Sequence, residues 1–340
     1  MSKPIQPPAP PAAEPLVWVL DSAYTGELGA RVGVAERLGY GYDTIPLPGT
    51  DAAAYARMLR ARYQLACGAG GERSLVLLSG TGEDTLGPVA DLRHDFDGRL
   101  LNVFLASILP DPPDPRLHEY DLIASPQIQG DKVVTTLGVA HKLNPARLEA
   151  ARRAHADRFA GLERPLVGLL VGGNTRYCAG FDVAHAQALG RKTRRVVESL
   201  GGSLVATNSR RTPADAWAAL LAEFDGLDRR CFDWRQDPGL YPALLAEGDV
   251  FIATGDSISM CSEASHTGKP LLVDLAESAT ESFHRAIVGK LLEYGAARHL
   301  DGGFEPWTYT PPDPAGAVAA AIQELLDRKA PRVLQAEKAR

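Results

Sequence analysis

The chain has 340 residues, enough for two domains or one large one. Hydrophobic residues make up 45% of it and charged residues 23%, which is the balance of a soluble globular protein. The formal net charge is −6. Proteins that bind nucleic acids usually carry a basic excess, so we expect no nucleic-acid partner.

The four cysteines lie far apart in the sequence and show no CxxC spacing, so neither a disulfide framework nor a zinc site is expected, and no metal site is predicted. No stretch approaches the ~20 apolar residues that a membrane span needs. Residues 1–15 are rich in Pro and Ala and predict a disordered tail. We expect a cytoplasmic protein, with peripheral contact at the inner face of the membrane left open.

Apolar runs of strand type alternate with helical patterns through the first half of the chain. Strands are predicted over residues 15–21, 42–48, 74–80, 100–107, 120–126 and 132–138. Helices are predicted over 26–39, over 51–67 with Asp51 as N-cap, and from residue 84 onward. This alternation is the signature of a doubly wound α/β sheet.

A polar helix over residues 144–165, with Asn144 as its cap, is expected to join the first half to a second one. Strands then follow over 165–173, 203–213, 229–234, 250–256 and 269–275. Helices are predicted over 182–202, 212–224 with Thr212 as cap, 239–249, from 257, and over 313–329 with Asp313 as cap. Ligands of open α/β sheets bind outside the carboxyl ends of the strands, so residues directly after strands are the functional candidates.

Two adjacent glycines follow the first strand of the second half, in the stretch "GGNTRYC". Gly172, Gly173 and Asn174 would let the backbone come close to a ligand, and their amides could meet a phosphate. The stretch matches neither the P-loop nor the GxGxxG pattern. A tight turn without a ligand is the alternative, and it stays open.

Hydroxyl groups and cations follow the second strand of this half, in the stretch "TNSRRTP". Thr207 and Ser209 supply the hydroxyls, and Arg210 and Arg211 supply two guanidinium groups, whose shape matches phosphate or carboxylate. A solvated basic turn is the alternative reading.

Small polar residues are concentrated after the fourth strand, in the stretch "ATGDSISMCSEASHTGKPLL". Thr254 ends the strand, and Asp256, Ser257 and Ser259 fall where a helix would begin, which is a natural seat for an anion. Glu263 lies one to two turns further on, where it suits a sugar or ribose hydroxyl. Asp256 could cap the helix or orient one of the two arginines; a capping residue and an exposed Glu are the plain alternative.

Three more polar residues follow the next strand, at Glu277, Glu281 and His284. Each of them, taken in isolation, is read as a surface residue. No function is assigned to them.

The stretches "VGGNTR", "TNSRRTP" and "ATGDSISMCSEASHTGKPLLV" together resemble the mitochondrial fission ELM family, over about residues 16 to 325. The opening strand resembles that family's first strand and ends in Asp21, but the family's Gln on the first helix is missing here. In "YDLIASPQIQGDKVVTTLGVAHKLNPARL", Gln127 stands where the family has an acidic and His pair.

The resemblance implies an α/β fold of the GT-B type, with two Rossmann-like domains facing across a cleft and a C-terminal helix crossing back. The expected domains are a tail over 1–15, an N-terminal acceptor domain over 16–150, a nucleotide-sugar donor domain over 151–312, and a helix over 313–330 that packs toward the first domain. Such proteins are similar to nucleotide-sugar glycosyltransferases.

By the same analogy, Glu263 would bind the nucleotide ribose, and Ser257 and Ser259 would meet the diphosphate. GT-B enzymes usually need no divalent metal, because helix dipoles and basic side chains neutralise the leaving diphosphate. Arg210 and Arg211 are the predicted cations, together with the glycine loop. The nucleotide sugar is then a substrate, and no separate cofactor is expected.

A base in the first domain would deprotonate the acceptor hydroxyl. Asp21 is the first candidate because it ends the first strand. Glu27 and Asp84 are weaker candidates, and Asp84 could instead cap a helix.

The predicted function is therefore a metal-independent glycosyltransferase that acts on a cell-envelope glycan or glycolipid. Two alternatives remain: a two-domain nucleotide-sugar epimerase, and a non-catalytic nucleotide-binding or scaffold protein. An NAD dehydrogenase is disfavoured because no GxGxxG follows the first strand.

Overall fold

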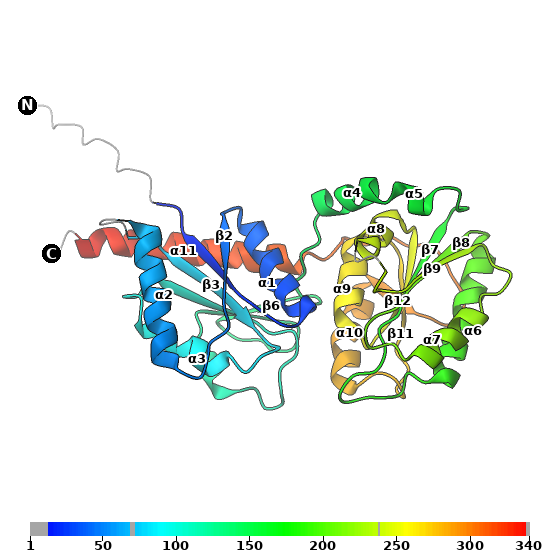
Figure 1. Cartoon of the computed structure of the whole chain (residues 1–340), viewed down its shortest axis with the longest axis horizontal. Coiled ribbons are helices and arrows are strands. Elements are labelled where there is room, and N and C mark those ends of the chain that lie inside the picture. Colours follow the sequence, from blue (N-terminus) through cyan, green and yellow to red (C-terminus); the bar gives the residue numbers. More distant parts are fainter. Residues whose placement is uncertain (1–12, 69–71, 237–238, 338–340) are drawn as a thin grey trace, which may run out of the picture. The chain divides into compact units, whose positions relative to one another are not determined.

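The computed structural model describes residues 13–68, 72–236 and 239–337, with side chains as far as residue 329, and the chain forms two compact units (Figure 1). One unit runs to Val134 and resumes at Gly316, and the other is Thr135–Ala315. The boundary was predicted at residue 150, but the units divide after Val134. The helix that follows packs inside the second unit, where Arg152 Nε lies 3.2 Å from Glu247 Oε1. The predicted tail over residues 1–15 lies, up to residue 12, outside the described residues.

The first unit holds a six-stranded sheet in the order β2-β1-β3-β4-β5-β6. Its strands are β1 (Leu16–Leu20), β2 (Tyr42–Ile45), β3 (Leu75–Gly80), β4 (Leu100–Leu105), β5 (Leu122–Ser125) and β6 (Val133–Thr135). Its α-helices are α1 (Thr25–Leu38), α2 (Ala52–Cys67), α3 (Leu86–Asp91) and most of α11 (Pro314–Glu337), with short 3₁₀ turns at Leu92–His94 and Pro115–Glu119. The pairs among β1 to β5 are parallel, and right-handed crossovers therefore place α1 and α2 on opposite faces.

Local sequence signals set the ends of these helices. Asp51 caps α2, as predicted, by accepting a hydrogen bond of 2.8 Å from the amide of Ala54. Gly39 ends α1 with φ 77°, a left-handed conformation that glycine adopts without steric cost. The last helix is longer than predicted and reaches Glu337.

The last helix packs within the first unit from Gly316 onward. The Tyr40 hydroxyl lies 2.9 Å from Gln323 Oε1, and Lys329 Nζ lies 3.0 Å from the Leu100 carbonyl oxygen. Residues far apart in the sequence thus complete this unit, as the GT-B resemblance implied for a helix that crosses back.

The second unit, Thr135–Ala315, holds a parallel six-stranded sheet in the order β12-β11-β10-β7-β8-β9. Its strands are β7 (Leu166–Leu170), β8 (Ser203–Thr207), β9 (Arg229–Phe232), β10 (Val250–Thr254), β11 (Leu271–Asp274) and β12 (Ala297–His299). Its helices are α4 (Pro145–Ala154), α5 (Ala156–Phe159), α6 (Val183–Leu200), α7 (Ala214–Ala222), α8 (Leu240–Glu247), α9 (Ile258–His266) and α10 (Ser282–Tyr294). This is the dinucleotide-fold strand order, whereas the first unit has the flavodoxin-like order.

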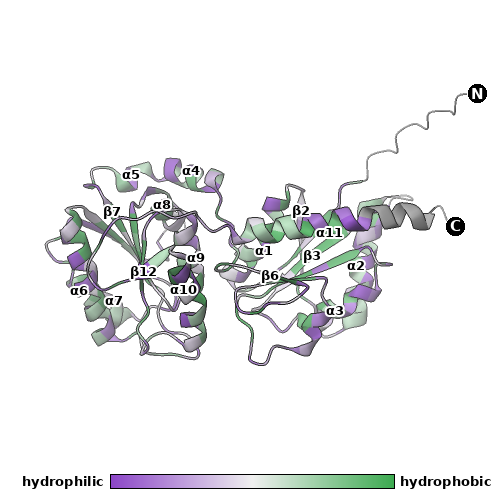
Figure 2. Cartoon of the chain, turned by 180° about the vertical axis from the view of Figure 1, so that it is seen from behind, coloured by the Kyte–Doolittle hydropathy of each residue, from purple (hydrophilic) through white to green (hydrophobic). Residues whose placement is uncertain are grey.

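The inner strands of this unit are buried on both faces, whereas the edge strands β9 and β12 are partly accessible, and the helices bury one side. Every residue of β7, β8 and β10 is buried. Helix α6 turns Leu189, Val196 and Val197 toward the sheet, and each such fully buried side chain stabilises the fold by about 1.5–3 kcal/mol. Figure 2 shows the same contrast, with hydrophobic strands and helices of mixed hydropathy.

Two elements of the second unit, α10 and β12, were not predicted. Ile287, Val288 and Leu291 are buried in α10, and Gly295 ends it with φ 86°. This is a helical spacing followed by a glycine, so the signal was present in the sequence. The predicted cap of α7 was wrong, because Pro213 and not Thr212 is the N-cap residue.

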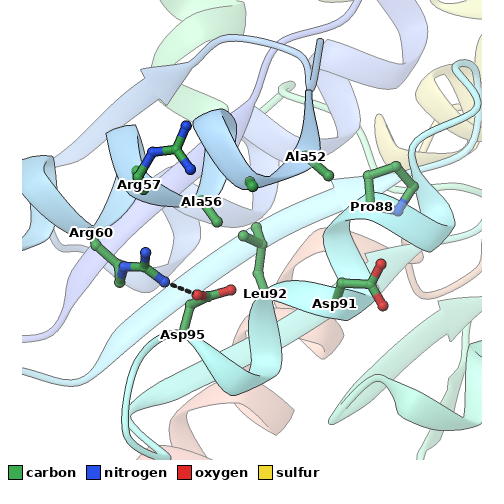
Figure 3. A pocket seen from close by; sticks show the side chains of 9 residues that line it. Ala52, Ala56, Arg57, Arg60, Pro88, Asp91, Leu92 and Asp95 are labelled. Carbon is green, nitrogen blue, oxygen red and sulfur yellow. Dashed lines mark hydrogen bonds and ion pairs between the residues drawn. The ribbon is translucent and has the colours of Figure 1, made fainter. Parts of the chain in front are cut away.

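A groove of about 320 Å³ lies in the first unit between α2 and α3 (Figure 3). It is lined by Ala52, Ala53, Ala56, Arg57, Arg60, Pro88, Asp91, Leu92 and Asp95. Arg60 and Asp95 pair across one end.

Within the part of the chain that the structure describes, no helix is both long enough and apolar enough to cross a membrane.

Candidate functional site

Polar residues that follow three strands of the second unit meet at one place in its sheet. The strand order turns back at β7, with β8 and β9 on one side and β10 to β12 on the other. The crevice outside such a switch point is where open α/β sheets bind ligands. The residues that follow β7, β8 and β10 are those that the sequence singled out.

An ion pair between the half-buried Arg211 and the buried Asp256 lies at the centre of this place. Nη1 of Arg211 is 2.7 Å from Oδ2 of Asp256, whose side chain is only 2% exposed. Burial raises the pKa of Asp256 above its usual value, and the Arg211 guanidinium opposes that change. Asp256 therefore orients Arg211, which is one of the two roles that the sequence left open; Ser257, not Asp256, is the N-cap residue of α9.

The two glycine amides are used inside the protein. Gly172 N donates to Thr254 Oγ1 at 2.8 Å, and Gly173 N donates to Asp256 Oδ2 at 2.9 Å. The expectation that these amides meet a phosphate therefore does not fit this structure, because each is already bonded. The glycines are needed for close approach instead: Gly173 has φ 137°, and a Cβ on Gly172 would lie 2.2 Å from Asp256 Oδ2.

The hydroxyl residues after β8 also hold the glycine loop. Ser209 Oγ and Thr212 Oγ1 each donate to the Gly172 carbonyl oxygen at 2.5 Å. Asn174 N donates to the Arg211 carbonyl oxygen at 3.1 Å, and the buried Thr207 bonds at 3.4 Å to the next carbonyl along the chain. These residues form the scaffold of the site.

Three predicted residues lie outside this scaffold: Arg210 after β8, and Ser257 and Ser259 at the start of α9. Arg210 is exposed, and Ser259 is half-buried on the first turn of α9. Ser257 is the N-cap residue of α9 but makes no capping bond with its side chain, so its hydroxyl is not committed to the helix end.

Glu263 lies further along α9, in a partly buried position. Its Oε2 accepts a hydrogen bond of 2.5 Å from the hydroxyl of Tyr241 in α8. Burial raises its pKa to about 7, although Tyr241 and Lys142 oppose the rise. A carboxyl group that changes charge near neutral pH is unusual and points to a functional position.

Replacing Gly172 by alanine tests the tight packing of the scaffold. The added methyl group would meet the Asp256 carboxylate, so we expect a loss of about 1–3 kcal/mol in unfolding free energy. Urea denaturation measures this, with Gly289→Ala as control, since no atom lies within 4 Å of a Cβ there. Equal stability of the two variants would contradict the packing described here.

The carboxyl edge of the first sheet has its own buried polar network, around Arg31 of α1. Arg31 is fully buried and donates to the carbonyl oxygens of Leu20 at 2.8 Å, Asp21 at 2.7 Å, Gly80 at 3.2 Å and Thr81 at 3.0 Å. Its guanidinium also lies 3.4 Å from Glu83 Oε2. These groups follow β1 and β3, the switch point of this sheet.

The candidate bases sit differently around this network. Asp21 is exposed, and its Oδ1 accepts a hydrogen bond of 2.8 Å from the next amide. Asp84 is exposed too and is not the helix cap, because Thr85 holds that position. Glu27 accepts hydrogen bonds from Thr81 at 3.1 Å and Ser107 at 3.0 Å. Burial raises the pKa of Glu27 above its usual value, against those two hydrogen bonds.

Sequence reasoning missed Arg31 and Glu83, and it placed Glu281 and His284 at the surface. The structure buries Glu281 and His284, with side chains 8% and 7% exposed, and pairs them at 2.5 Å. Glu277 is exposed, as expected. Among the described residues, no three His, Cys, Asp or Glu side chains are grouped so that they could hold a metal ion.

Two solved structures with a similar fold are UDP-GlcNAc 2-epimerases. The UDP-GlcNAc 2-epimerase of Methanocaldococcus jannaschii superposes with a TM-score of 0.61 at 11% identity, covering 93% of this chain and 100% of that one. The enzyme from Neisseria meningitidis, solved bound to UDP-GlcNAc, gives 0.53 at 12% identity, with coverage of 93% and 100%. Identities this low establish the fold alone, and the fold is the α/β GT-B type, with two parallel six-stranded sheets.

Sequence relatives are more informative about the family. The Arabidopsis thaliana "Mitochondrial fission protein ELM1" is 34% identical over 206 residues, which are 58% of this chain and 46% of that protein. Protein RP120 of Rickettsia prowazekii is 24% identical over 198 residues, 56% of this chain and 55% of that protein. The chain spans about half the length of these curated relatives. The family described as Mitochondrial fission ELM1 matches residues 26–326, nearly the whole chain, and this protein belongs to it.

Proposed function

We propose that this protein binds a nucleotide sugar at the carboxyl edge of its second sheet and transfers the sugar, as a metal-independent glycosyltransferase. The observation that carries the proposal is the meeting of the polar ends of β7, β8 and β10 at the switch point of that sheet. The Arg211–Asp256 ion pair and the hydrogen bonds of the glycine loop hold these groups in place, and fixed polar groups at such an edge are what an anionic ligand needs.

The roles within the proposed site follow from exposure. Asp256 and Arg211 fix the scaffold. Arg210, with Ser257 and Ser259 at the start of α9, is proposed to meet the diphosphate. Arg210 is exposed and Ser259 is half-buried, while the buried Ser257 makes no capping bond with its side chain. Glu263 is proposed to bind the ribose hydroxyls, with Tyr241 holding one of its carboxyl oxygens and leaving the other for the ligand.

Acceptor activation is proposed for the first unit. Asp21 has an exposed carboxylate directly after β1, and Glu27 has a half-buried carboxyl group whose raised pKa suits proton exchange. A cell-envelope glycan or glycolipid is the proposed acceptor, with peripheral contact at the inner face of the membrane.

Two other functions share these features. The epimerases with the same fold support nucleotide-sugar epimerisation, which needs no acceptor. A binding role without turnover is supported by Gln127, which replaces the family's acidic and His pair and whose Oε1 accepts a hydrogen bond of 2.6 Å from Leu109 N. Incubation with UDP-GlcNAc and no acceptor tests the first, because epimer formation supports it. A bound nucleotide with no turnover across a panel of donors supports the second.

Calorimetry with UDP, UDP-GlcNAc and a panel of other nucleotide sugars tests the proposal. We expect the Arg210→Ala variant to bind the preferred ligand about tenfold more weakly, because one charge-assisted contact is worth about 1.5 kcal/mol. Arg191→Ala, on the exposed side of α6, is the matched control and should bind as the unmodified protein does. Absence of binding across the panel would remove the proposal.

A further inference from the structure

The loop after β7 crosses the sheet edge instead of turning back at once. Asn174 is bonded to Arg211, beyond β8, while Cys178 Sγ donates to the Ser278 carbonyl oxygen, beyond β11, at 3.4 Å. Since β10 lies between β7 and β11, the loop has to pass the carboxyl end of β10, where α9 begins.

A buried brace holds the far side of this loop. The Thr175 hydroxyl donates to Glu281 Oε1 and accepts the amides of Tyr177 and Cys178, each at 3.1 Å. The other carboxyl oxygen of Glu281 lies 2.5 Å from His284 Nδ1. Burial favours a raised pKa for Glu281, but Thr175, its own amide and His284 together hold the pKa below its usual value. The charged Glu281 carboxylate thus holds the loop in place through Thr175.

Arg176 sits on the exposed part of this braced loop. Its guanidinium lies over the ring of Tyr177, 4.5 Å from the ring centre, and that ring packs edge-on against Phe283 at 5.6 Å. Tyr177 is 59% exposed. Within the described part of the chain, Arg176 has no carboxylate at ion-pair distance, whereas Arg211 is already paired with Asp256.

The backbone amides next to Arg176 in the loop are not available to bind an anion. The amides of Gly172, Gly173, Asn174 and Thr175 all donate to partners within the unit. The positive groups left to face a ligand are therefore side chains, and an arginine already stacked on a ring loses less conformational freedom when it binds.

We propose that Arg176 is a binding residue of the same site, supplying a guanidinium to the diphosphate of the nucleotide, and that Thr175 and Glu281 are its positioning residues. The inference rests on the proposed function. A guanidinium fork fits two phosphate oxygens at once, which a lysine cannot reproduce.

Calorimetry with UDP and with inorganic pyrophosphate tests the proposed role of Arg176. We expect Arg176→Ala to weaken UDP binding at least tenfold and Arg176→Lys to recover only part of that loss. Arg153→Ala, on the exposed helix α4, is the matched control. Thr175→Val should weaken binding, and Thr175→Ser, which keeps the hydroxyl, should restore it; circular dichroism checks that each variant is folded.

The outcomes separate the two proposals. Unmodified protein that binds UDP, with Arg176→Ala binding equally well, overturns this inference and leaves the proposed function standing. Equal affinities for Thr175→Val and Thr175→Ser overturn the positioning role. If the unmodified protein binds neither UDP nor pyrophosphate, the inference is wrong; if it also binds no nucleotide sugar of the panel, the proposed function is wrong too.

Discussion

Replacing Arg31 by methionine will destabilise the first unit by about 3–5 kcal/mol, the range found when one partner of a buried charged network is removed. Methionine keeps most of the volume but donates no hydrogen bond. The carbonyl oxygens of Leu20, Asp21, Gly80 and Thr81 would lose their donor, and Glu83 would lose its ion pair. The measurement is the unfolding free energy from urea denaturation.

The control for this experiment is Arg57→Met, which changes the same residue type at an exposed position of α2. We expect it to change stability by less than about 0.5 kcal/mol, as exposed substitutions usually do. The unfolding free energy of Arg31→Lys should remain well below that of the unmodified protein, because one ammonium group cannot reach two pairs of carbonyl oxygens. If Arg31→Met were as stable as Arg57→Met, the network would be structurally unimportant.

Most strands and helices could be predicted from the sequence, because apolar spacing and helix caps depend on residues that are neighbours in the chain. Apolar runs predicted the buried strands, and Asp51 and Asn144 marked helix starts that the structure confirms by their hydrogen bonds. The helix α10 was overlooked although Ile287, Val288 and Leu291 carry helical spacing.

The members of the candidate site could be predicted better than their partners. The order of parallel strands brings their carboxyl ends together, so residues after strands were sound candidates. The sequence could not show that Asp256 would bond Gly173 and Arg211, since 83 and 45 residues separate these pairs. It therefore assigned to ligand binding several groups that hold the scaffold.

Arg31 and Glu83 were missed for a different reason. Charged residues are rarely fully buried, so a sequence pattern places them at the surface by default. Here the burial is stabilised by carbonyl oxygens at the ends of β1 and β3, which only the assembled sheet brings together.

Stability of the second unit should fall as the pH rises from about 4.5 to about 7, because of Glu263. The pKa of this carboxyl is about 7 in the folded protein, against a usual value of 4.5. Between those values the folded protein holds a proton that the unfolded chain has lost, so raising the pH favours unfolding. The full penalty is about 3 kcal/mol once the pH exceeds both values.

The Glu263→Gln variant removes this penalty because glutamine carries no charge and can still accept the Tyr241 hydrogen bond. Compared with the unmodified protein, we expect it to be about equally stable near pH 4.5 and about 3 kcal/mol more stable near pH 8. Glu277→Gln, whose side chain is 87% exposed, is the control and should show no such dependence. Urea denaturation across this pH range decides the matter: a stability difference that stays constant with pH would mean that Glu263 is charged at all these pH values in the folded protein.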